Sequence, residues 1–513
     1  MATVNSMKTR LPQKERGRPA RARQSWKLAG GPPALLAVAT IYRGRKTTIK
    51  SLGMVVFGVV LLAGGCAKKQ TSIWESIKNL ETVAQLKSFV AEKEAQANAA
   101  TNAPSPEMKA FFAAAEMGNW PAVNNKFWDI RNHTEKYERL RGTRWEAIIE
   151  TWGAFEAFGE GDEKYSAIYA SEIINSIPAG SIYFGATDHG RFLVTAMQKK
   201  QAAGDPFFTL SQNPLTDSAY LDYLRSMYGG KIFTLMDEDL EKSIRDYTTN
   251  ALRRLVHDKQ FPGEPKQVMP GEEIKLDANG RILLNNQMNV IGIRALLAKI
   301  IFDQNSNREF YIEEGFPLEW MYPYLEPHGM IFKLNRQPLS TLSDDTVRRD
   351  REYWTQLVAP MIGDWLKPDT TVADIAAFAE KVHVKKDLNG FTGDARFIQN
   401  DIAQKMFSKE RSSIAGLYAW RPQHIDDIRY EVDLAEKQRM NAAADFAFRQ
   451  AWALCPGSME TVIRYVNLLV SGNRRADALL VAETAAKMPE MKGRDGDQLR
   501  ELIKPLQQKQ PAE

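Results

Sequence analysis

Four short apolar segments constrain the fold of this chain most strongly, because amphipathic helical patterns lie between them. The segments span residues 181–188, 205–213, 308–315 and 329–335. Apolar runs of this length are typical of buried strands, whereas the longer stretches between them repeat their apolar residues at helical spacing. This alternation predicts a small α/β (Rossmann-like) layer with a largely parallel sheet, which we place at residues 178–340.

Two further features are expected inside this layer. Residues 272–286 have the pattern of a hairpin that turns at Ala278-Asn279-Gly280, because asparagine followed by glycine favours tight turns. Residues 318–326 have the pattern of a helix that precedes the last strand.

Helices are expected on both sides of the layer. Aromatic and small residues at three- and four-residue steps predict helical hairpins over 107–177 and a further helical domain over 341–492. Within the second domain, residues 425–490 have the spacing of tetratricopeptide repeats, whose period is about 34 residues. The residues that carry this pattern are Ala444, Phe448, Ala451 and Pro456, and then Ala478, Ala482 and Ala485. An ordinary antiparallel helical hairpin is the alternative, and in either case the predicted fold class is mixed and mainly α.

The remaining segments are expected to lie outside the packed body. Residues 1–65 form a leader, 66–106 a helix followed by a tether rich in alanine and asparagine, and 493–513 a charged tail. The net charge of +5 comes from residues 1–50, where Glu15 is the only acid, while the rest of the chain is net acidic. This distribution argues against nucleic acid as a partner.

An uncharged run at residues 51–65 follows a basic stretch and ends directly before Cys66. The run is shorter than the about 20 apolar residues that cross a bilayer, so it has the form of a signal peptide. Its end, Leu62-Ala63-Gly64-Gly65-Cys66, resembles the lipobox of bacterial lipoproteins. The resemblance implies that Cys66 is acylated, carries lipid chains such as palmitate, and becomes the N-terminus that anchors the protein to the lipid bilayer.

The residue after the lipidated cysteine bears on the destination of such a protein. Ala67 stands there, as it does in lipoproteins that resemble the outer-membrane class. We therefore expect a lipid-anchored protein of the bacterial cell envelope, on the periplasmic face of the outer membrane. An uncleaved single-span anchor with an incidental cysteine is the alternative.

The central region also resembles a known family. The residues that carry the resemblance are INSIPAGSIYFGATDHGRF (174–192), SAYLDYLRSMYG (218–229) and FPLEWMYPYLEPHGMIFKLNRQPL (316–339). They are similar to the soluble region that follows the membrane bundle in an uncharacterised bacterial family related to C-type glycosyltransferases and protein O-mannosyltransferases. The similarity covers residues 160–490. Those enzymes act through acidic residues on a loop between membrane helices, and no multi-span region is recognisable here, so the resemblance implies the soluble module and not its catalysis.

The most suggestive polar cluster follows the first predicted strand. Asp188, His189 and Arg191 stand where that strand ends and a helix begins, and ligands of open α/β sheets bind at the carboxyl ends of strands. A helix N-terminus and an arginine together suit an anion. Gln212 and Asn213 follow the second strand and are expected at the same edge, with Glu313 and Glu314 ending the third. The alternative is structural: Asp188 caps the helix and Arg191 forms a surface ion pair.

Other candidate sites have weaker support in the sequence. Asp237-Glu238-Asp239 matches the D-x-D triplet of metal-dependent glycosyltransferases, but acids at a helix start are also favoured by the helix dipole. The six histidines are widely spaced, so we expect no metal site and no cofactor. Cys455, the second cysteine, is expected to be a buried inert thiol.

These observations favour a non-catalytic envelope lipoprotein whose helical repeats bind a protein or peptide partner. The first alternative is an accessory module of a glycan-assembly or protein-glycosylation system, with a membrane glycosyltransferase as its partner. The second alternative is an enzyme whose site lies at the end of the first α/β strand.

Overall fold

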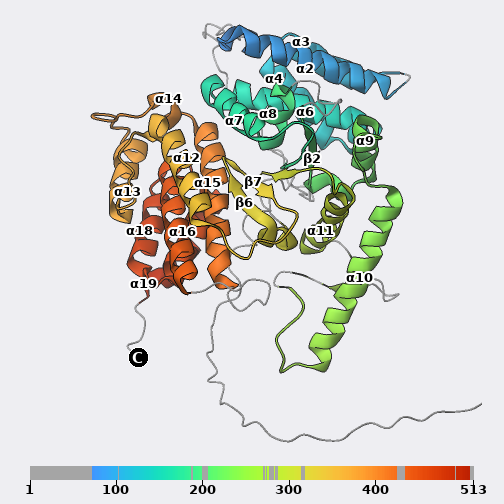
Figure 1. Cartoon of the computed structure of the whole chain (residues 1–513). Helices are drawn as coiled ribbons and strands as arrows, with labels where there is room; N and C mark the ends of the chain where they lie inside the picture. The colour runs from blue at the N-terminus through green and yellow to red at the C-terminus, as the bar shows by residue number, and fades with distance from the viewer. Residues whose placement is uncertain are drawn as a thin grey trace, which may run out of the picture.

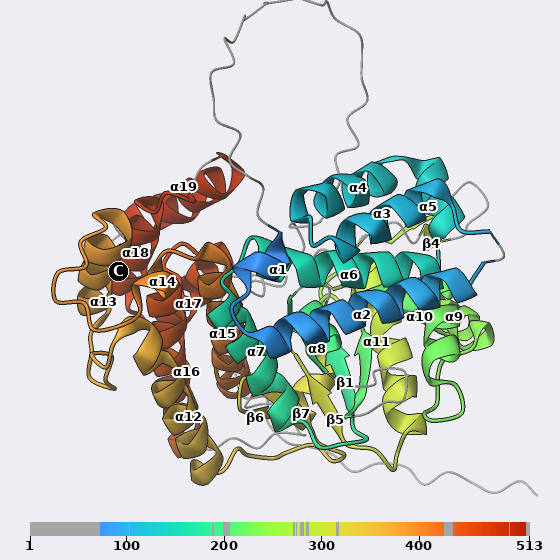
Figure 2. The same ribbon diagram turned by 90° about the horizontal axis from the view of Figure 1, so that it is seen from above.

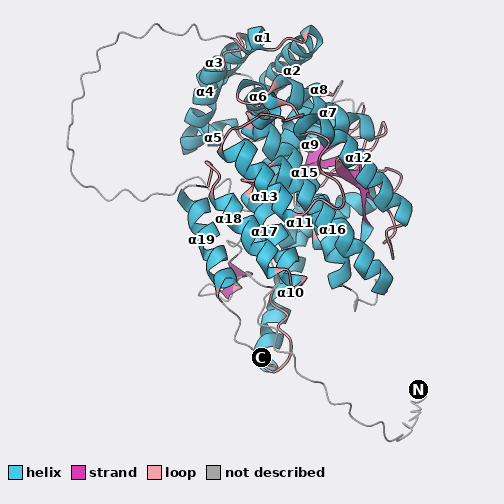
Figure 3. Ribbon diagram, turned by 90° about the vertical axis from the view of Figure 1, so that its left-hand side faces the viewer, coloured by secondary structure: helices cyan, strands magenta, loops and turns pink. Residues whose placement is uncertain are grey.

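Helices form most of the chain and surround a small sheet of five strands (Figures 1 and 3). The computed structural model describes residues 72–508 except 102, 187–188, 199–205, 270–271, 273, 277–281, 284–286, 314–317, 425–433 and 492. The expected mainly α fold class is confirmed, and the structure adds a small mixed sheet of five strands. The leader, Cys66 and Asp188 lie outside the described residues.

The sheet has the order β2-β1-β5-β7-β6. Its strands are β1 (Ile182–Gly185), β2 (Phe208–Ser211), β5 (Phe310–Ile312), β6 (Leu325–His328) and β7 (Ile331–Leu334). All four predicted strands are therefore confirmed, and each lies inside its predicted segment. β1 pairs in parallel with β2 and with β5, whereas β7 is antiparallel to both β5 and β6. The sheet is thus mixed, and the expectation of a largely parallel sheet holds only for its β2-β1-β5 half.

The strand β6 replaces part of a predicted helix. Residues 318–326 form a short 3₁₀ helix, η4 (Glu319–Tyr324), and the chain then extends into β6. Pro323 and Pro327 explain the difference, because proline cannot donate the backbone hydrogen bonds of an α-helix interior but is tolerated in an edge strand. Gly329, with φ +60°, then forms the turn from β6 to β7.

Chain connections diverge between β1 and β5. The helix α8 (His189–Met197) leads from β1 to β2 on one side. The chain from β2 passes through η3 (Asn213–Thr216), α9 (Ser218–Tyr228), α10 (Asp237–Gln260) and α11 (Gln287–Gln304) before it enters β5 on the other side of β1. The predicted hairpin is present as β3 (Lys275–Leu276) and β4 (Ile282–Leu283), which pair antiparallel, although its turn is not among the described residues.

Hairpins of helices cover one side of the layer, as predicted for residues 107–177 (Figure 2). These elements are α1 (Ile73–Ser76), α2 (Leu80–Ala99), α3 (Pro106–Glu116), α4 (Trp120–Asn132), α5 (Thr134–Leu140), α6 (Thr143–Gly159) and α7 (Glu163–Ser176). The expected tether is wrong for residues 91–99, which continue α2. Lys93 and Ala97 are fully buried there, because the small alanines let α2 pack against α6 while Lys93 finds an acidic partner on that helix.

The C-terminal helices lie beside the β6–β7 end of the sheet (Figure 1). They are α12 (Asp344–Ile362), α13 (Val372–Ala379), the π-helical turn η5 (Glu380–Val384), α14 (Ala395–Ile398), α15 (Asp401–Gln423), α16 (Leu434–Leu454), α17 (Met459–Ser471), α18 (Arg475–Ala486) and α19 (Gly493–Gln507). Of these, α12 contacts β6 and α15 contacts β7. The expected charged tail is wrong for residues 493–507, since α19 packs on α18 and buries Leu499.

One hydrophobic core joins the α/β layer to the C-terminal helices, and a second lies among the N-terminal helices. The two ranges predicted as separate domains, 178–340 and 341–492, therefore share a single core. In the described part of the chain, no helix has both the length and the apolar character that crossing a bilayer requires.

A buried ion pair lies at the centre of the C-terminal helices. Arg411 of α15 donates to both carboxylate oxygens of Asp350 on α12, at 3.0 and 2.8 Å, and to Gln450 of α16 at 2.8 Å. The Tyr418 hydroxyl donates to the same aspartate at 2.9 Å, and the guanidinium lies over the ring of Trp354. Three helices are thus joined through one arginine.

We expect Asp350→Asn to lower the free energy of unfolding by about 3–5 kcal/mol, because it leaves the Arg411 cation buried without a counter-ion. Urea unfolding followed by circular dichroism measures this loss. Asp345→Asn is the matched control on the same helix, since Asp345 pairs with Arg348 in an exposed position; its unfolding midpoint is expected to stay unchanged. Equal midpoints for the two variants would contradict a central role for the Arg411 pair.

Candidate functional site

In α/β layers of this topology, the binding crevice usually lies at the carboxyl ends of two neighbouring strands, which here are β1 and β5. Connections leave β1 and β5 in opposite directions, and such a divergence is the usual binding position in open α/β sheets. Here the crevice is occupied by the chain itself. The side chain of Glu313, the residue directly after β5, is fully buried at this point.

Groups from several elements hold the Glu313 carboxylate. The backbone N–H of Ala186, which follows β1, donates to it at 2.8 Å, and the Lys409 ammonium of α15 lies 2.9 Å away. The Tyr183 hydroxyl of β1 and the Tyr169 hydroxyl of α7 lie at 3.4 Å. A buried carboxylate needs such partners, because loss of hydration costs several kcal/mol.

Gly190 lets the carboxylate approach the start of α8. A Cβ atom placed on Gly190 would overlap the Glu313 carboxyl group. Helix N-termini attract anions through their free N–H groups and the helix dipole. The chain thus puts its own carboxylate where a ligand's anionic group would bind in a nucleotide-binding α/β protein.

A second buried acid extends this cluster into the C-terminal helices. Glu410 of α15 accepts a 2.5 Å hydrogen bond from the Tyr169 hydroxyl, and the Lys409 ammonium lies 3.8 Å from it. Lys409 and Glu410 therefore connect α15 to both α7 and the sheet. The cluster of Glu313, Glu410, Lys409, Tyr169 and Tyr183 cross-links the two halves of the molecule.

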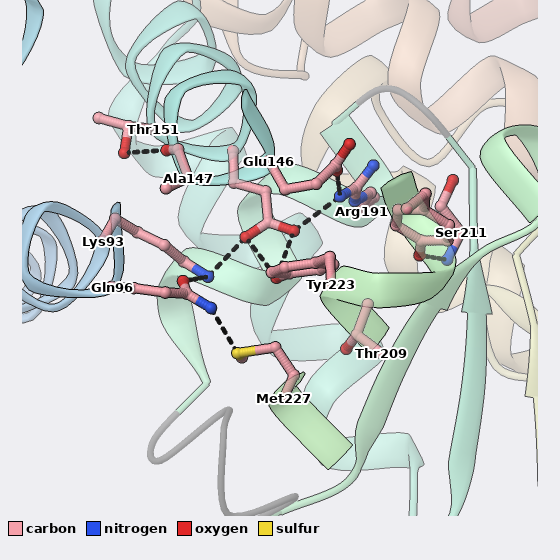
Figure 4. A network of polar contacts seen from close by, with 12 residues as sticks. Lys93, Gln96, Glu146, Ala147, Thr151, Arg191, Thr209, Ser211, Tyr223 and Met227 are labelled. Carbon is pink, nitrogen blue, oxygen red and sulfur yellow. Dashed lines mark hydrogen bonds and ion pairs between the residues drawn. The ribbon is translucent and has the colours of Figure 1, made fainter. Parts of the chain in front are cut away.

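Arg191 is committed to a different, structural network (Figure 4). Its guanidinium donates to Glu146 at 2.6 Å and to Glu150 at 2.7 Å, both on α6, and only 3% of the residue is exposed. Lys93 of α2 adds an ion pair to Glu150 at 2.5 Å, and the Tyr223 hydroxyl of α9 donates to the same carboxylate. The expected anion-binding role of Arg191 therefore finds no support in its contacts, and the predicted alternative of an ion pair is buried rather than on the surface.

The two acids of this network respond differently to their surroundings. Burial would raise the pKa of Glu150, but the charges of Lys93 and Arg191 outweigh burial and lower it. Burial dominates at Glu146, whose pKa is raised although Arg191 acts against the shift. Glu150 is thus the principal counter-ion of the two cations.

The other predicted residues are distributed along the same edge. His189 begins α8, and its Nε2 lies 3.8 Å from a carboxylate oxygen of Glu156 on α6. Gln212 is buried directly after β2, and Asn213 accepts a hydrogen bond from Arg294 of α11 at 3.1 Å. Sequence reasoning missed Arg294, because a single basic residue in an apolar helix gives no signal of its own.

The contacts of the remaining candidates, the Asp237–Asp239 triplet and Cys455, indicate structural roles. Asp239 accepts from the backbone N–H of Met236 at the start of α10, and Asp237 accepts from Arg225. Cys455 is buried directly after α16, and burial raises the pKa of its thiol to about 12. Over the residues that the structure describes, no cluster of three or more histidine, cysteine or acidic side chains could hold a metal ion.

Comparison of this chain with protein-family models, with curated proteins and with solved structures finds no match.

We expect Gly190→Ala to lower the free energy of unfolding by about 2 kcal/mol or more, because the added methyl group displaces the Glu313 carboxylate from its partners. Gly416→Ala is the matched control: its Cβ meets only the Arg464 guanidinium, at 4.0 Å, and alanine is favoured over glycine inside a helix. Urea unfolding of both variants provides the measurement. A Gly190→Ala protein as stable as Gly416→Ala would show that the close approach is unimportant.

Proposed function

We propose that the mature chain is a non-catalytic, lipid-anchored protein of the bacterial envelope that binds a protein or peptide partner. The observation that carries the proposal is the filled crevice between β1 and β5. Its anion-binding groups already contact the fully buried Glu313 carboxylate. A substrate would have to displace a carboxylate that is paired with Lys409, at a cost of several kcal/mol.

The helical hairpins of the C-terminal region support an architecture of tetratricopeptide-like pairs. In this proposal α16 is the second helix of one repeat and α17 and α18 form the next, inside the predicted range 425–490, while α15 precedes that range and packs along α16. Their faces are largely used within the molecule, because α15 packs against α7 and β7 while α16 and α18 pack against α13. A partner therefore requires another surface.

The region around α10 supplies such a surface. In Figure 1, α10 extends beyond the packed body, and only Ser243, Tyr247 and Ala251 of this helix are buried. Half of the large exposed hydrophobic residues in the described chain belong to this region: Met236, Val256, Phe261, Met269 and Leu296. Val256 lies within α10, Met236 and Phe261 lie at its two ends, Met269 follows it, and Leu296 belongs to α11. Val256 and Phe261, exposed near one end of a projecting helix, suit a contact with a protein partner.

The partner-binding proposal is tested by affinity capture from detergent-solubilised envelopes, followed by mass spectrometry. We expect the double variant Val256→Glu/Phe261→Glu to reduce recovery of the captured protein at least about tenfold, because charge at a desolvated contact is costly. Lys259→Glu on the same helix is the matched control, since it changes the net charge equally without removing apolar surface, and it is expected to retain capture. Asp188→Ala is also expected to retain it.

Two outcomes would contradict the proposal. Equal recovery by the double variant and by wild type would exclude α10 as the binding surface. Loss of a measured catalytic turnover in Asp188→Ala would establish the enzyme instead. If the protein captured through α10 is a membrane glycosyltransferase, the role of this chain would be that of an accessory module in glycan assembly.

Lipid anchoring is tested by growing cells with radioactive palmitate. We expect wild type and Cys455→Ser to be labelled and Cys66→Ser to be unlabelled. Cys455 is a suitable control because its thiol is buried and, with a raised pKa, protonated at neutral pH. Label that persists in Cys66→Ser, or unlabelled wild type, would contradict the anchor.

A further inference from the structure

Arg294 lies in an unusual setting beside the end of β2. It belongs to α11, which packs on η3, the short helix that follows β2. One guanidinium nitrogen donates to the side-chain oxygen of Asn213 at 3.1 Å. The Nε atom is buried without an acceptor, and no carboxylate among the described residues pairs with this cation.

Four other buried or half-buried arginines of the described chain have anionic partners or several carbonyl partners. Arg191 and Arg411 bond to buried carboxylates. Arg308 donates to the backbone carbonyls of Gly180 and Lys231, and Arg336 donates to three backbone carbonyls and lies over the ring of Phe302. Arg294 has one neutral amide oxygen instead, although an arginine taken out of water normally has an anionic or multiple carbonyl partner.

Gln212, the residue before Asn213, lacks a hydrogen-bond donor, whereas Arg294 lacks an acceptor. Gln212 is 4% exposed, and its side-chain oxygen is buried without a hydrogen-bond donor. Buried polar atoms in native proteins are almost always paired, so each exception needs a physical explanation. A missing acceptor on Arg294 and a missing donor on Gln212 therefore lie on adjoining elements.

We propose that Arg294, Asn213 and Gln212 form a binding site for a small phosphorylated molecule that carries a hydroxyl group beside its phosphate. The phosphate oxygens accept from the Arg294 guanidinium, whose planar donors suit this geometry. The ligand hydroxyl donates to the Gln212 side-chain oxygen. A sugar phosphate has this combination of groups, whereas inorganic phosphate has only the first.

The charge state of Arg294 supports phosphate binding. Burial lowers the pKa of Arg294 to about 10, so the guanidinium is still protonated at neutral pH. A phosphate would supply the missing counter-charge. This site uses none of the residues that the partner-capture variants change, Val256, Phe261 and Lys259, so its test does not depend on the partner-binding proposal.

Calorimetric titration and thermal melting of the full chain in detergent test the site. The probes are glucose 1-phosphate, inorganic phosphate and glucose, each at the same ionic strength set with sodium chloride. We expect glucose 1-phosphate to bind and to raise the melting temperature, inorganic phosphate to bind more weakly, and glucose to have no effect. Arg294→Gln is expected to lower the affinity for glucose 1-phosphate at least about tenfold, because a charge-assisted contact is lost.

Two variants separate binding from structure. Arg294→Gln without ligand is expected to keep or raise the melting temperature, since it removes a cation without a counter-ion; a merely structural arginine would lower it. Gln212→Met is expected to lower the affinity for glucose 1-phosphate and to leave the affinity for inorganic phosphate unchanged. Arg245→Gln, on the exposed face of α10, is the charge control and should bind like wild type.

The proposal is overturned if glucose 1-phosphate binds Arg294→Gln as tightly as wild type, or if it affects wild type no more than sodium chloride does. Equal binding of glucose 1-phosphate and inorganic phosphate, with both lost in Arg294→Gln, would support the phosphate contact and overturn the role of Gln212.

Discussion

The fully buried carboxylate of Glu313 is the constraint on which the arrangement of the layers depends. Water cannot stabilise it, so the protein must provide every partner. Those partners come from the end of β1, from α7 and from α15, which are far apart in the sequence. Satisfying one charge therefore fixes the sheet, the N-terminal helices and the C-terminal helices relative to one another.

Buried ion pairs repeat this solution at the other interfaces between layers. Lys93 and Arg191 share Glu150 where α2, α6 and α8 meet, and Arg411 meets Asp350 where α12, α15 and α16 meet. Removal of one partner from such a pair is far more costly than replacement of both by apolar residues. The pairs thus contribute more to the specificity of the packing than to its net stability, and they account for charged residues that would otherwise suggest a catalytic site.

The sequence predicts a helix or strand correctly where the local residue pattern determines it. It fails where a contact with a distant part of the chain determines the structure. β1, β2 and β5 are recognisable because each apolar run is buried on both faces, and β7 because all its residues but Lys333 are apolar and buried. β6 is not, since its residues continue a pattern that resembles a helix, and Pro327 within it gives no strand signal. The continuation of α2 through Lys93 is also hidden, because a lysine in an alanine-rich stretch indicates solvent unless its partner Glu150 is known.

The same distinction applies to the candidate site. Chain order correctly places His189, Gln212, Asn213 and Glu313 after parallel strands, because strand ends define one edge of a sheet. It does not reveal where side chains point. Arg191 bonds to α6, and Arg294 reaches Asn213 from a helix that enters the chain much later. Both contacts depend on tertiary packing, which the spacing of residues along the sequence does not predict.

The contrast between Glu313 and Arg294 bears directly on function. The protein surrounds its buried carboxylate with an ammonium, a backbone N–H and two hydroxyl groups, yet it leaves a partly buried guanidinium with one neutral acceptor. Natural sequences generally satisfy polar groups at every level, and departures concentrate where a ligand completes the set. The closed crevice at β1 and β5 and the incomplete cluster after β2 are therefore the reason to propose the phosphate-binding site beside the switch point of the sheet rather than within it.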